Sequence, residues 1–500
     1  MIRFNLNALL MIAGLILISS CNTVHKKHNS SFFIGDNEQE GDGSFQNPWK
    51  SFALADMKKL QAGDTLFFMG GQSFEESIRI DSLLCGTDEK PLVITSFGEK
   101  PAIIQSGNVG GIHVYNSKHL KIEHIRFIGS GRKEGNTQNG LLLNSCSHIS
   151  LSDIETEGYQ KSGLNIYQSS DIIADGIYAH DNGFSGILVF GRRGCKDASR
   201  NILIRNSKAE NNPGDPTVLN NHSGNGILAG YSTNVTIEYC TATNNGWDMP
   251  RKGNGPVGIW TYESDSILIQ YCISYRNKTS EGAADGGGFD LDGGVTHSVI
   301  QYCLSYENEG SAFGIFQFAG ASPWYNNTIR YCISENDGNV SAAQAGVFIW
   351  NASDDPQQLK DCCFYNNSIY NEKGAAISYE AQSENSGFKF FNNIFVANNE
   401  LITGKELTGT FLGNNWYSLS SNYDSMKEKN GLTINPEFRK AGKTNITDPQ
   451  LLKSFDAYFL PEQSPLKIKG IDLEKQFGIN AGKIDFNGKQ ALKKGIGACL

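Results

Sequence analysis

Residues 286–308 read GGGFDLDGGVTHSVIQYCLSYEN, and this stretch decides the fold. After Gly288, apolar and polar residues alternate, and a second alternating segment follows and ends in Asn308. Alternation with a period of two between turns rich in Gly and Asn predicts two short β-strands. A unit this short cannot bury its own apolar face, so it must stack on similar units.

The same pattern recurs along most of the chain. The spacings from Gly140 to Gly163 and from Gly163 to Gly186 are 23 residues each, and later spacings are longer because loops are inserted. Further first segments start at Gly226, Gly258, Gly288, Ala312 and Gly346. The repeat predicts an all-β chain folded as a single-stranded right-handed parallel β-helix.

Four cysteines occupy one position of four successive units: Cys240, Cys272, Cys303 and Cys332. Equivalent positions of stacked strands lie about 4.8 Å apart, so these side chains should form one interior row. We expect free thiols packed as small apolar groups, although an oxidising compartment would also permit disulfides. A metal site is not indicated, because no His joins the row and no C-x-x-C pair occurs.

The first residues form a targeting segment. Arg3 precedes an apolar run from Leu9 to Ile18, and the tetrapeptide Ile18-Ser19-Ser20-Cys21 resembles a bacterial lipobox. We therefore expect residues 1–21 to be a lipoprotein signal peptide and Cys21 to be lipidated. The protein should be anchored to a bacterial membrane, and the sequence leaves open whether it faces the periplasm or the cell surface.

Three further segments follow this signal. Residues 31–93 should form an N-terminal cap and the first strands, with a short helix over Ser51–Gln61 because Leu54, Met57 and Leu60 have helical spacing. Residues 94–399 should form the β-helix. Residues 400–500 should hold the last coils and an irregular C-terminal tail, because the repeat fades there.

Composition limits the possible partners. The formal net charge is −9, and no basic stripe could neutralise a row of phosphates, so nucleic acid is excluded as a partner. We expect a monomer.

Several stretches are similar to a known family. They are GDGSFQNPWKSF (41–52), AGDTLFFMGGQSF (62–74), the coil at 286–308, and the closing SPLKIKGID, DFNGKQ and GIGA. These stretches resemble the pectate-lyase-like right-handed β-helix proteins of Bacteroidetes. The resemblance implies a carbohydrate-active fold but no single activity, since such proteins include lyases, hydrolases, epimerases and binding modules.

Strand parity indicates where chemistry could occur. In the strand after Gly288, Phe289 and Leu291 should point inward, so Asp290 and Asp292 should point outward about 6.6–6.8 Å apart. The same parity exposes aromatic side chains on neighbouring coils, and we expect them to bind substrate: Trp260, Tyr262, Phe316, Phe348 and Trp350. Glu263 and Arg192 are further candidates for substrate binding.

Two carboxyl groups beside exposed aromatic rings favour a glycoside hydrolase. One carboxyl group would protonate the leaving oxygen, and the other would act as base or nucleophile. The mutual repulsion of Asp290 and Asp292 would raise one pKa, which favours one protonated and one ionised group. On this interpretation the protein degrades a polysaccharide or oligosaccharide without a metal or other cofactor.

Two alternatives remain open. A polysaccharide lyase would use a Lys or Arg base with calcium, and its candidate parts are Arg192, Arg193, Lys196, Arg251, Lys252, Asp248 and Asp285. A non-catalytic carbohydrate-binding surface protein would need only the aromatic face. No role is assigned to His180, His222 or His297, which occur in turn-like contexts.

Overall fold

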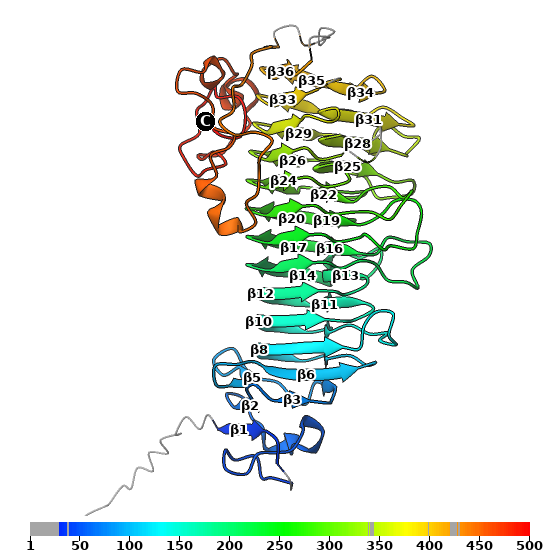
Figure 1. The fold of residues 1–500 in the computed structure, drawn as a ribbon, viewed down its shortest axis with the longest axis vertical. Coiled ribbons are helices and arrows are strands. Elements are labelled where there is room, and N and C mark those ends of the chain that lie inside the picture. Colours follow the sequence, from blue (N-terminus) through cyan, green and yellow to red (C-terminus); the bar gives the residue numbers. More distant parts are fainter. Residues whose placement is uncertain are drawn as a thin grey trace, which may run out of the picture.

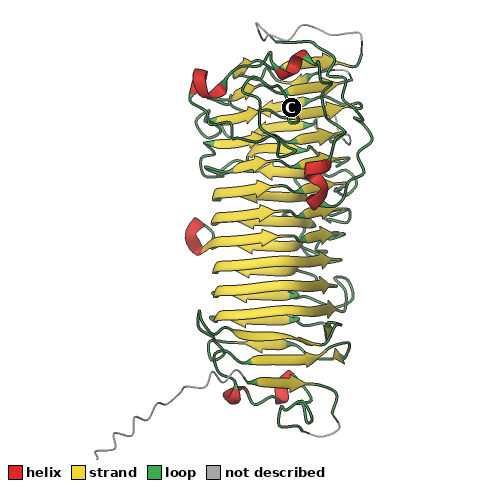
Figure 2. Cartoon of the chain, turned by 90° about the vertical axis from the view of Figure 1, so that its left-hand side faces the viewer, coloured by secondary structure: helices red, strands yellow, loops and turns green. Residues whose placement is uncertain are grey.

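The computed structural model describes residues 30–37, 40–338, 340, 345–398, 400–420, 428 and 431–500. The chain winds into a tall stack of coils whose strands pair in parallel (Figure 1). Figure 2 shows the same strands as successive rungs of one elongated body. The paired strands begin at Ser31 and end at Ser418, so the ladder starts before residue 94 and continues past residue 399.

One sheet of 12 strands runs the length of the stack and is called here the 12-strand sheet. Its strands are β4 (Ile78–Ile80), β7 (Ile112–Tyr115), β9 (Leu141–Asn144), β11 (Ser162–Tyr167), β13 (Ser185–Phe190), β16 (Asn225–Gly230), β19 (Val257–Tyr262), β22 (Gly287–Leu291), β25 (Phe313–Gln317), β28 (Val347–Asn351), β31 (Ile377–Ala381) and β34 (Ile402–Gly404).

The other 24 strands form the remaining sides of the coils. They are β1 (Ser31–Ile34), β2 (Thr65–Met69), β3 (Ser73–Phe74), β5 (Leu92–Phe97), β6 (Ala102–Gly107), β8 (Lys118–Gly129), β10 (Ser147–Glu157), β12 (Ser170–His180), β14 (Ser199–Arg205), β15 (Lys208–Glu210), β17 (Ser232–Glu238), β18 (Thr241–Thr243), β20 (Asp265–Gln270), β21 (Ile273–Tyr275), β23 (Val299–Gln301), β24 (Leu304–Tyr306), β26 (Asn327–Arg330), β27 (Ile333–Glu335), β29 (Cys362–Tyr365), β30 (Ser368–Asn371), β32 (Lys389–Phe391), β33 (Ile394–Ala397), β35 (Thr410–Leu412) and β36 (Asn415–Ser418).

The interior of the stack follows the predicted parity. Phe289 and Leu291 are buried in a single apolar core that runs from Ile34 to Trp416. Cys240, Cys272, Cys303 and Cys332 are fully buried in this core, and all described cysteines are free thiols. The expected interior row of unbonded sulfurs is therefore confirmed.

Buried Asn side chains form a second row at the corner of the coils. The Nδ2 of Asn212 donates to Asn245 Oδ1 at 2.8 Å, and Asn245 donates to Asn277 Oδ1 at 2.8 Å. Asn277 donates to Asn308 Oδ1 at 2.9 Å, and Asn308 donates to Asp337 Oδ1 at 2.8 Å. The Asn at the end of each repeat therefore satisfies buried polar groups from one coil to the next.

The expected short helix over Ser51–Gln61 is interrupted. Two short 3₁₀ turns, η1 (Phe52–Leu54) and η2 (Met57–Lys59), take its place, because Ala55 between them has an extended backbone. Leu54 is exposed rather than buried. Met57 and Leu60 still pack against the first coils, so the segment covers the N-terminal end of the core.

The tail folds back along the side of the stack (Figure 1). It contains η4 (Pro449–Ser454), η5 (Pro465–Lys467) and the short α1 (Leu473–Phe477), and a further turn, η3 (Lys196–Ala198), lies in an inserted loop. The tail contacts coils far apart: Gln450 Nε2 donates to Asn206 Oδ1 at 2.8 Å, and Asn392 Nδ2 donates to the carbonyl oxygen of Ile471 at 2.9 Å.

No helix among the described residues is long and apolar enough to cross a membrane. Cys21 and the rest of the expected signal peptide lie outside the described residues.

Candidate active site

A cavity of about 310 Å³ opens on the outer face of the 12-strand sheet, and we call it the Asp290 cavity. Its floor is formed by β19, β22, β25, β28 and β31, and its wall by the inserted loops before β19 and β22. The lining residues are Gly253, Asn254, Gly255, Val257, Trp260, Ala284, Asp285, Asp290, Asp292, Phe316, Phe318, Phe348, Trp350 and Glu380.

Asp290 is the most deeply placed acidic group of this cavity. Its side chain points outward from β22, as parity predicts, yet only 2% of the residue is exposed. Burial raises the pKa of its carboxyl group well above the ordinary value, and the charges of Asp292 and Asp285 raise it further. Its Oδ1 has no hydrogen-bond partner in the described chain. Burial therefore favours the protonated form of the Asp290 carboxyl group, and its Oδ1 is uncommitted at the cavity.

Asp292 and Asp285 are half-buried at the same cavity. Burial raises the pKa of Asp292 to about 7, while the N–H of Gly293, which donates to Oδ1 at 2.7 Å, lowers it. Burial raises the pKa of Asp285 to about 6, and the N–H of Gly255 donates to its Oδ2 at 2.7 Å. The three carboxyl groups thus share the site with raised pKa values, and the shift favours the protonated form most strongly at Asp290.

Trp260 is fixed from behind by polar and aromatic neighbours. Its Nε1 donates to Asn225 Oδ1 at 3.1 Å, and its ring meets the ring of His222 edge-on at 4.8 Å. Burial lowers the pKa of His222 to about 4, so the imidazole is neutral and accepts a hydrogen bond from Asn225 Nδ2 at 3.1 Å. His222, which has no role predicted from sequence, therefore helps to hold one wall of the cavity.

The expectation of freely exposed aromatic rings is only partly met. Trp260, Phe316 and Phe348 lie outside the coil interior, but they are buried, with 3%, 9% and 7% of each residue exposed. Phe316 packs edge-on against Phe348 at 5.2 Å and against Trp350 at 6.2 Å. The rings cover one another and the inserted loops cover part of them, so they form the sides of an enclosed cavity rather than a flat face.

Three predicted residues lie elsewhere. Tyr262 is stacked on Trp260 at 5.4 Å but does not line the cavity. Glu263 is buried, and its Oε1 accepts a hydrogen bond from the N–H of Ser322 at 2.8 Å, so it holds a loop. Arg192 is exposed, and its backbone forms a β-bridge with Cys195 across a tight turn.

Sequence reasoning missed one acidic residue of the cavity, Glu380, and named another, Asp285, only for the lyase alternative. Asp285 was considered only as a possible cation ligand, and it lies in an inserted loop that carries no periodic signal. Glu380 pairs with Trp350 in the register between β28 and β31, so extending the parity argument by one coil would have found it. The register therefore contained the signal for Glu380 but not for Asp285.

Comparison with known proteins places this architecture in a family. The model of the Pel9A-like right-handed β-helix region matches residues 32–338. The chain belongs to this Pel9A-like family. The fold is accordingly an all-β right-handed parallel β-helix, as the repeats predict. No curated protein matches the chain.

Of the solved structures similar to this Pel9A-like protein, those with a TM-score above 0.5 share its fold at low identity. A GH136 lacto-N-biosidase from Eubacterium ramulus is 15% identical, covers 77% of this chain and 68% of its own, and has a TM-score of 0.52. The selenomethionine derivative of that enzyme is 17% identical, covers 72% of this chain and 68% of its own, and has a TM-score of 0.51. Pectate lyase Pel9A is 13% identical over 93% of this chain and 96% of its own, with a TM-score of 0.44.

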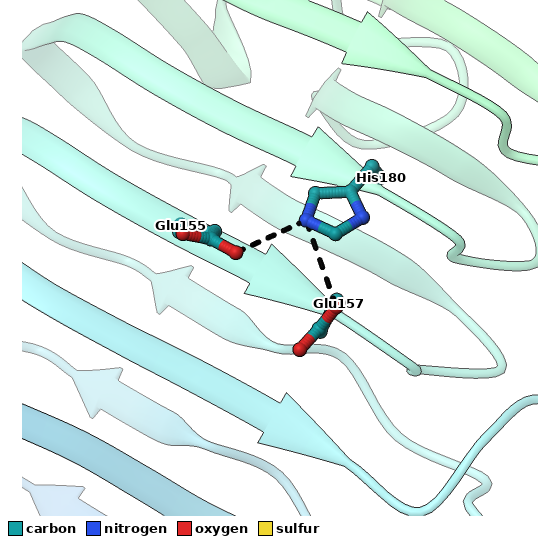
Figure 3. A group of neighbouring side chains, drawn as sticks. All are labelled: Glu155, Glu157 and His180. Carbon is teal, nitrogen blue, oxygen red and sulfur yellow. Dashed lines mark hydrogen bonds and ion pairs between the residues drawn. The ribbon is translucent and has the colours of Figure 1, made fainter.

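A second polar cluster of this Pel9A-like protein lies on β10 and β12, away from the cavity. The side chains of Glu155, Glu157 and His180 converge there (Figure 3), and their ligand atoms lie within 4.8 Å of one another. Arg126 pairs with both glutamates, at 2.9 Å from Glu155 Oε1 and 2.6 Å from Glu157 Oε1. His180 Nδ1 also contacts Asp181 at 2.6 Å. Arg126 and His180 already pair with these carboxylates, which favours a structural charge network over a metal site.

Proposed function

We propose that the protein acts on polysaccharides as a glycoside hydrolase, with Asp290 as general acid and Asp292 as base or nucleophile. The observation that carries this proposal is the buried Asp290 carboxyl group, whose pKa is raised and whose Oδ1 is unpaired beside two further carboxyl groups. A neutral carboxyl group can donate its proton to the glycosidic oxygen, while an ionised neighbour attacks the sugar or activates water.

The surroundings support the same chemistry. The parts of Trp260 and Phe316 that line the cavity and the more exposed Trp350 offer apolar surfaces to sugar rings, and the recessed position of the carboxyl groups partly shields them from water. Family membership supports a carbohydrate-active protein. The GH136 lacto-N-biosidase, which shares the fold, is itself named as a glycoside hydrolase.

The calcium-assisted lyase is less well supported by the cavity. A lyase needs a Lys or Arg base beside the uronate, and none of the described residues that line the cavity is basic. The lyase alternative would also place Asp248 and Asp285 around calcium. Among the described residues, no three acidic groups that include either of them have ligand atoms within 4.8 Å of one another. A non-catalytic binding protein would use the same aromatic walls and would differ only in lacking turnover.

Product analysis tests the proposal. Purified protein is incubated with a panel of neutral and acidic polysaccharides, and reducing ends and ultraviolet absorption are both measured. A hydrolase releases reducing ends without new absorption, whereas a lyase produces an unsaturated, absorbing product. Binding of a polysaccharide without either signal would indicate a non-catalytic binding protein and would contradict the hydrolase proposal.

The location of the protein is a separate proposal. We propose that Cys21 carries a lipid and anchors the protein to a bacterial membrane, facing the periplasm or the cell surface, since the segment before it has the features of a lipoprotein signal. Anchoring there would give the cavity access to extracytoplasmic polysaccharide. We further propose that the protein acts as a monomer.

A further inference from the structure

The charge of the Asp290 cavity is of one sign. Every ionisable side chain among its lining residues is a carboxyl group, contributed by Asp285, Asp290, Asp292 and Glu380. The other described lining residues are aromatic, aliphatic, glycine or asparagine. A sugar bound there would therefore meet apolar rings and four carboxyl groups, with no basic side chain among the described lining residues.

The basic side chains of the neighbouring segments are directed elsewhere. Arg193 Nε lies 3.5 Å from the hydroxyl of Tyr231, and Lys196 Nζ donates to the carbonyl oxygen of Gly294 at 2.6 Å. Lys405, which follows β34, donates to the carbonyl oxygen of Ala381. None of these three basic side chains lines the cavity, so none contacts a ligand bound inside it.

The loop that forms the wall next to β19 contains two more basic residues. Arg251 and Lys252 immediately precede the lining residues Gly253 to Gly255, but neither lines the cavity. Arg251 is close enough for its charge to lower the pKa of Asp285, so it offsets part of the charge of that carboxylate rather than offering a free cation to a ligand.

We propose that the Asp290 cavity selects sugar units without a carboxylate and rejects uronates by charge repulsion. The inference rests on the proposed function only in assuming that a polysaccharide enters this cavity. A uronate held against Trp260 would bring its own negative charge beside Asp285 and Asp292 in a partly dehydrated site, where like charges repel far more strongly than in water. Built-in repulsion of this kind discriminates between ligands of the same shape.

The experiment compares polymers that differ only in charge. Three polyuronates, namely polygalacturonate, alginate and polyglucuronate, are each paired with the carboxyl-reduced polymer made from the same sample, so that linkage and length are matched. Binding is measured by affinity gel electrophoresis with the otherwise intact Asp290→Asn protein, in which an amide retains the hydrogen-bonding shape of the neutral acid. We expect at least one reduced polymer to bind, with its uronate partner weaker by at least about tenfold.

A double variant tests the origin of the discrimination. Replacing Asp285 and Asp292 with Asn in the same background removes the repelling charges and should narrow the difference within the pair that binds. The proposal is overturned if the single and double variants prefer the reduced polymer over its uronate partner to the same degree. It is also overturned if a uronate binds more tightly than its reduced partner, or if no reduced polymer binds.

The same polymers separate this inference from the proposed hydrolysis. If the unmodified protein binds a reduced polymer but releases no reducing ends, the hydrolase proposal fails and the charge selection stands. If it hydrolyses a polyuronate as fast as its reduced partner, without an absorbing product, hydrolysis stands and the charge selection is overturned.

Discussion

Gly314 lies opposite Asp290 on the neighbouring strand, and a Cβ atom at residue 314 would come within 2.8 Å of Asp290 Oδ1. The missing side chain of Gly314 is therefore what makes room for the Asp290 carboxyl group. This relationship ties the position of the proposed acid to a residue that has no functional group of its own.

Gly314→Ala should displace the Asp290 carboxyl group and reduce turnover by about tenfold or more, since small displacements of a catalytic group are costly. The backbone at Gly314 is not in the left-handed region, so the coil should still form. Turnover and the thermal unfolding midpoint are measured together. Normal turnover in a folded variant would show that the Asp290 position is not critical.

Asp290→Asn and Asp292→Asn should each lower turnover by a factor on the order of 10² or more while the protein remains folded. Asp171→Asn is the matched control, because Asp171 is an outward carboxylate on β12 that pairs only with polar surface groups such as Asn201. Trp260→Ala should act mainly on KM. If both site variants turn over a confirmed substrate normally, the two carboxyl groups are structural.

The Asp292 carboxyl group should make stability depend on pH. Its pKa is raised to about 7 by burial, compared with about 3.9 in an unfolded chain, so the folded state binds more protons between these values. Stability from this group is therefore present at low pH and is lost as pH rises from about 4 to about 7. The difference in Tm between Asp292→Asn and the unmodified protein should grow in favour of the variant over that range. A difference in Tm that stays constant over this pH range would contradict a raised pKa for Asp292.

The thiols should fall into two reactivity classes. Cys85, Cys195 and Cys363 are partly exposed, whereas seven others are buried: Cys146, Cys240, Cys272, Cys303, Cys332, Cys362 and Cys499. Brief alkylation of the native protein followed by mass spectrometry should label the first group, and the second group should react only after unfolding. A disulfide recovered between any two of Cys240, Cys272, Cys303 and Cys332 would contradict the prediction that these cysteines are free thiols packed in the core.

Cys21→Ser should leave the protein without lipid and release it from the membrane fraction. Electrophoretic mobility and fractionation are compared with those of the unmodified protein. A variant that stays in the membrane fraction with unchanged mobility would contradict the lipobox assignment.

The sequence predicts the structure of the repeating coils, but it does not predict the structure of the segments outside the repeat. The inward Phe289 and the outward Asp290 follow from parity, and the cysteine row follows from equivalent positions, because stacking makes each coil a copy of the last. The burial of Trp260 by the inserted loops could not be predicted, because these loops do not follow the sequence repeat. The helix over Ser51–Gln61 is interrupted because three residues at helical spacing do not establish a continuous helix against an extended Ala55.

The path of the tail is the other feature that the sequence did not predict, because its contacts are irregular and far apart in the chain. Tyr302, for example, donates from its hydroxyl to the carbonyl oxygen of Ile484 at 3.4 Å. Each such contact depends on the folded stack and leaves no pattern in the tail itself.

This tail changes how the stack should come apart. In a solenoid, each coil touches only its neighbours, so an end coil can fray without disturbing the rest. Here the tail joins the coil of Asn206 to the coil of Asn392, and β19 to β31 lie between them. Opening any coil in that span requires the tail to be peeled away, which merges separate local openings into one larger, rarer event. The coils that carry Asp290 are thus protected from piecemeal unravelling and from proteases that depend on it.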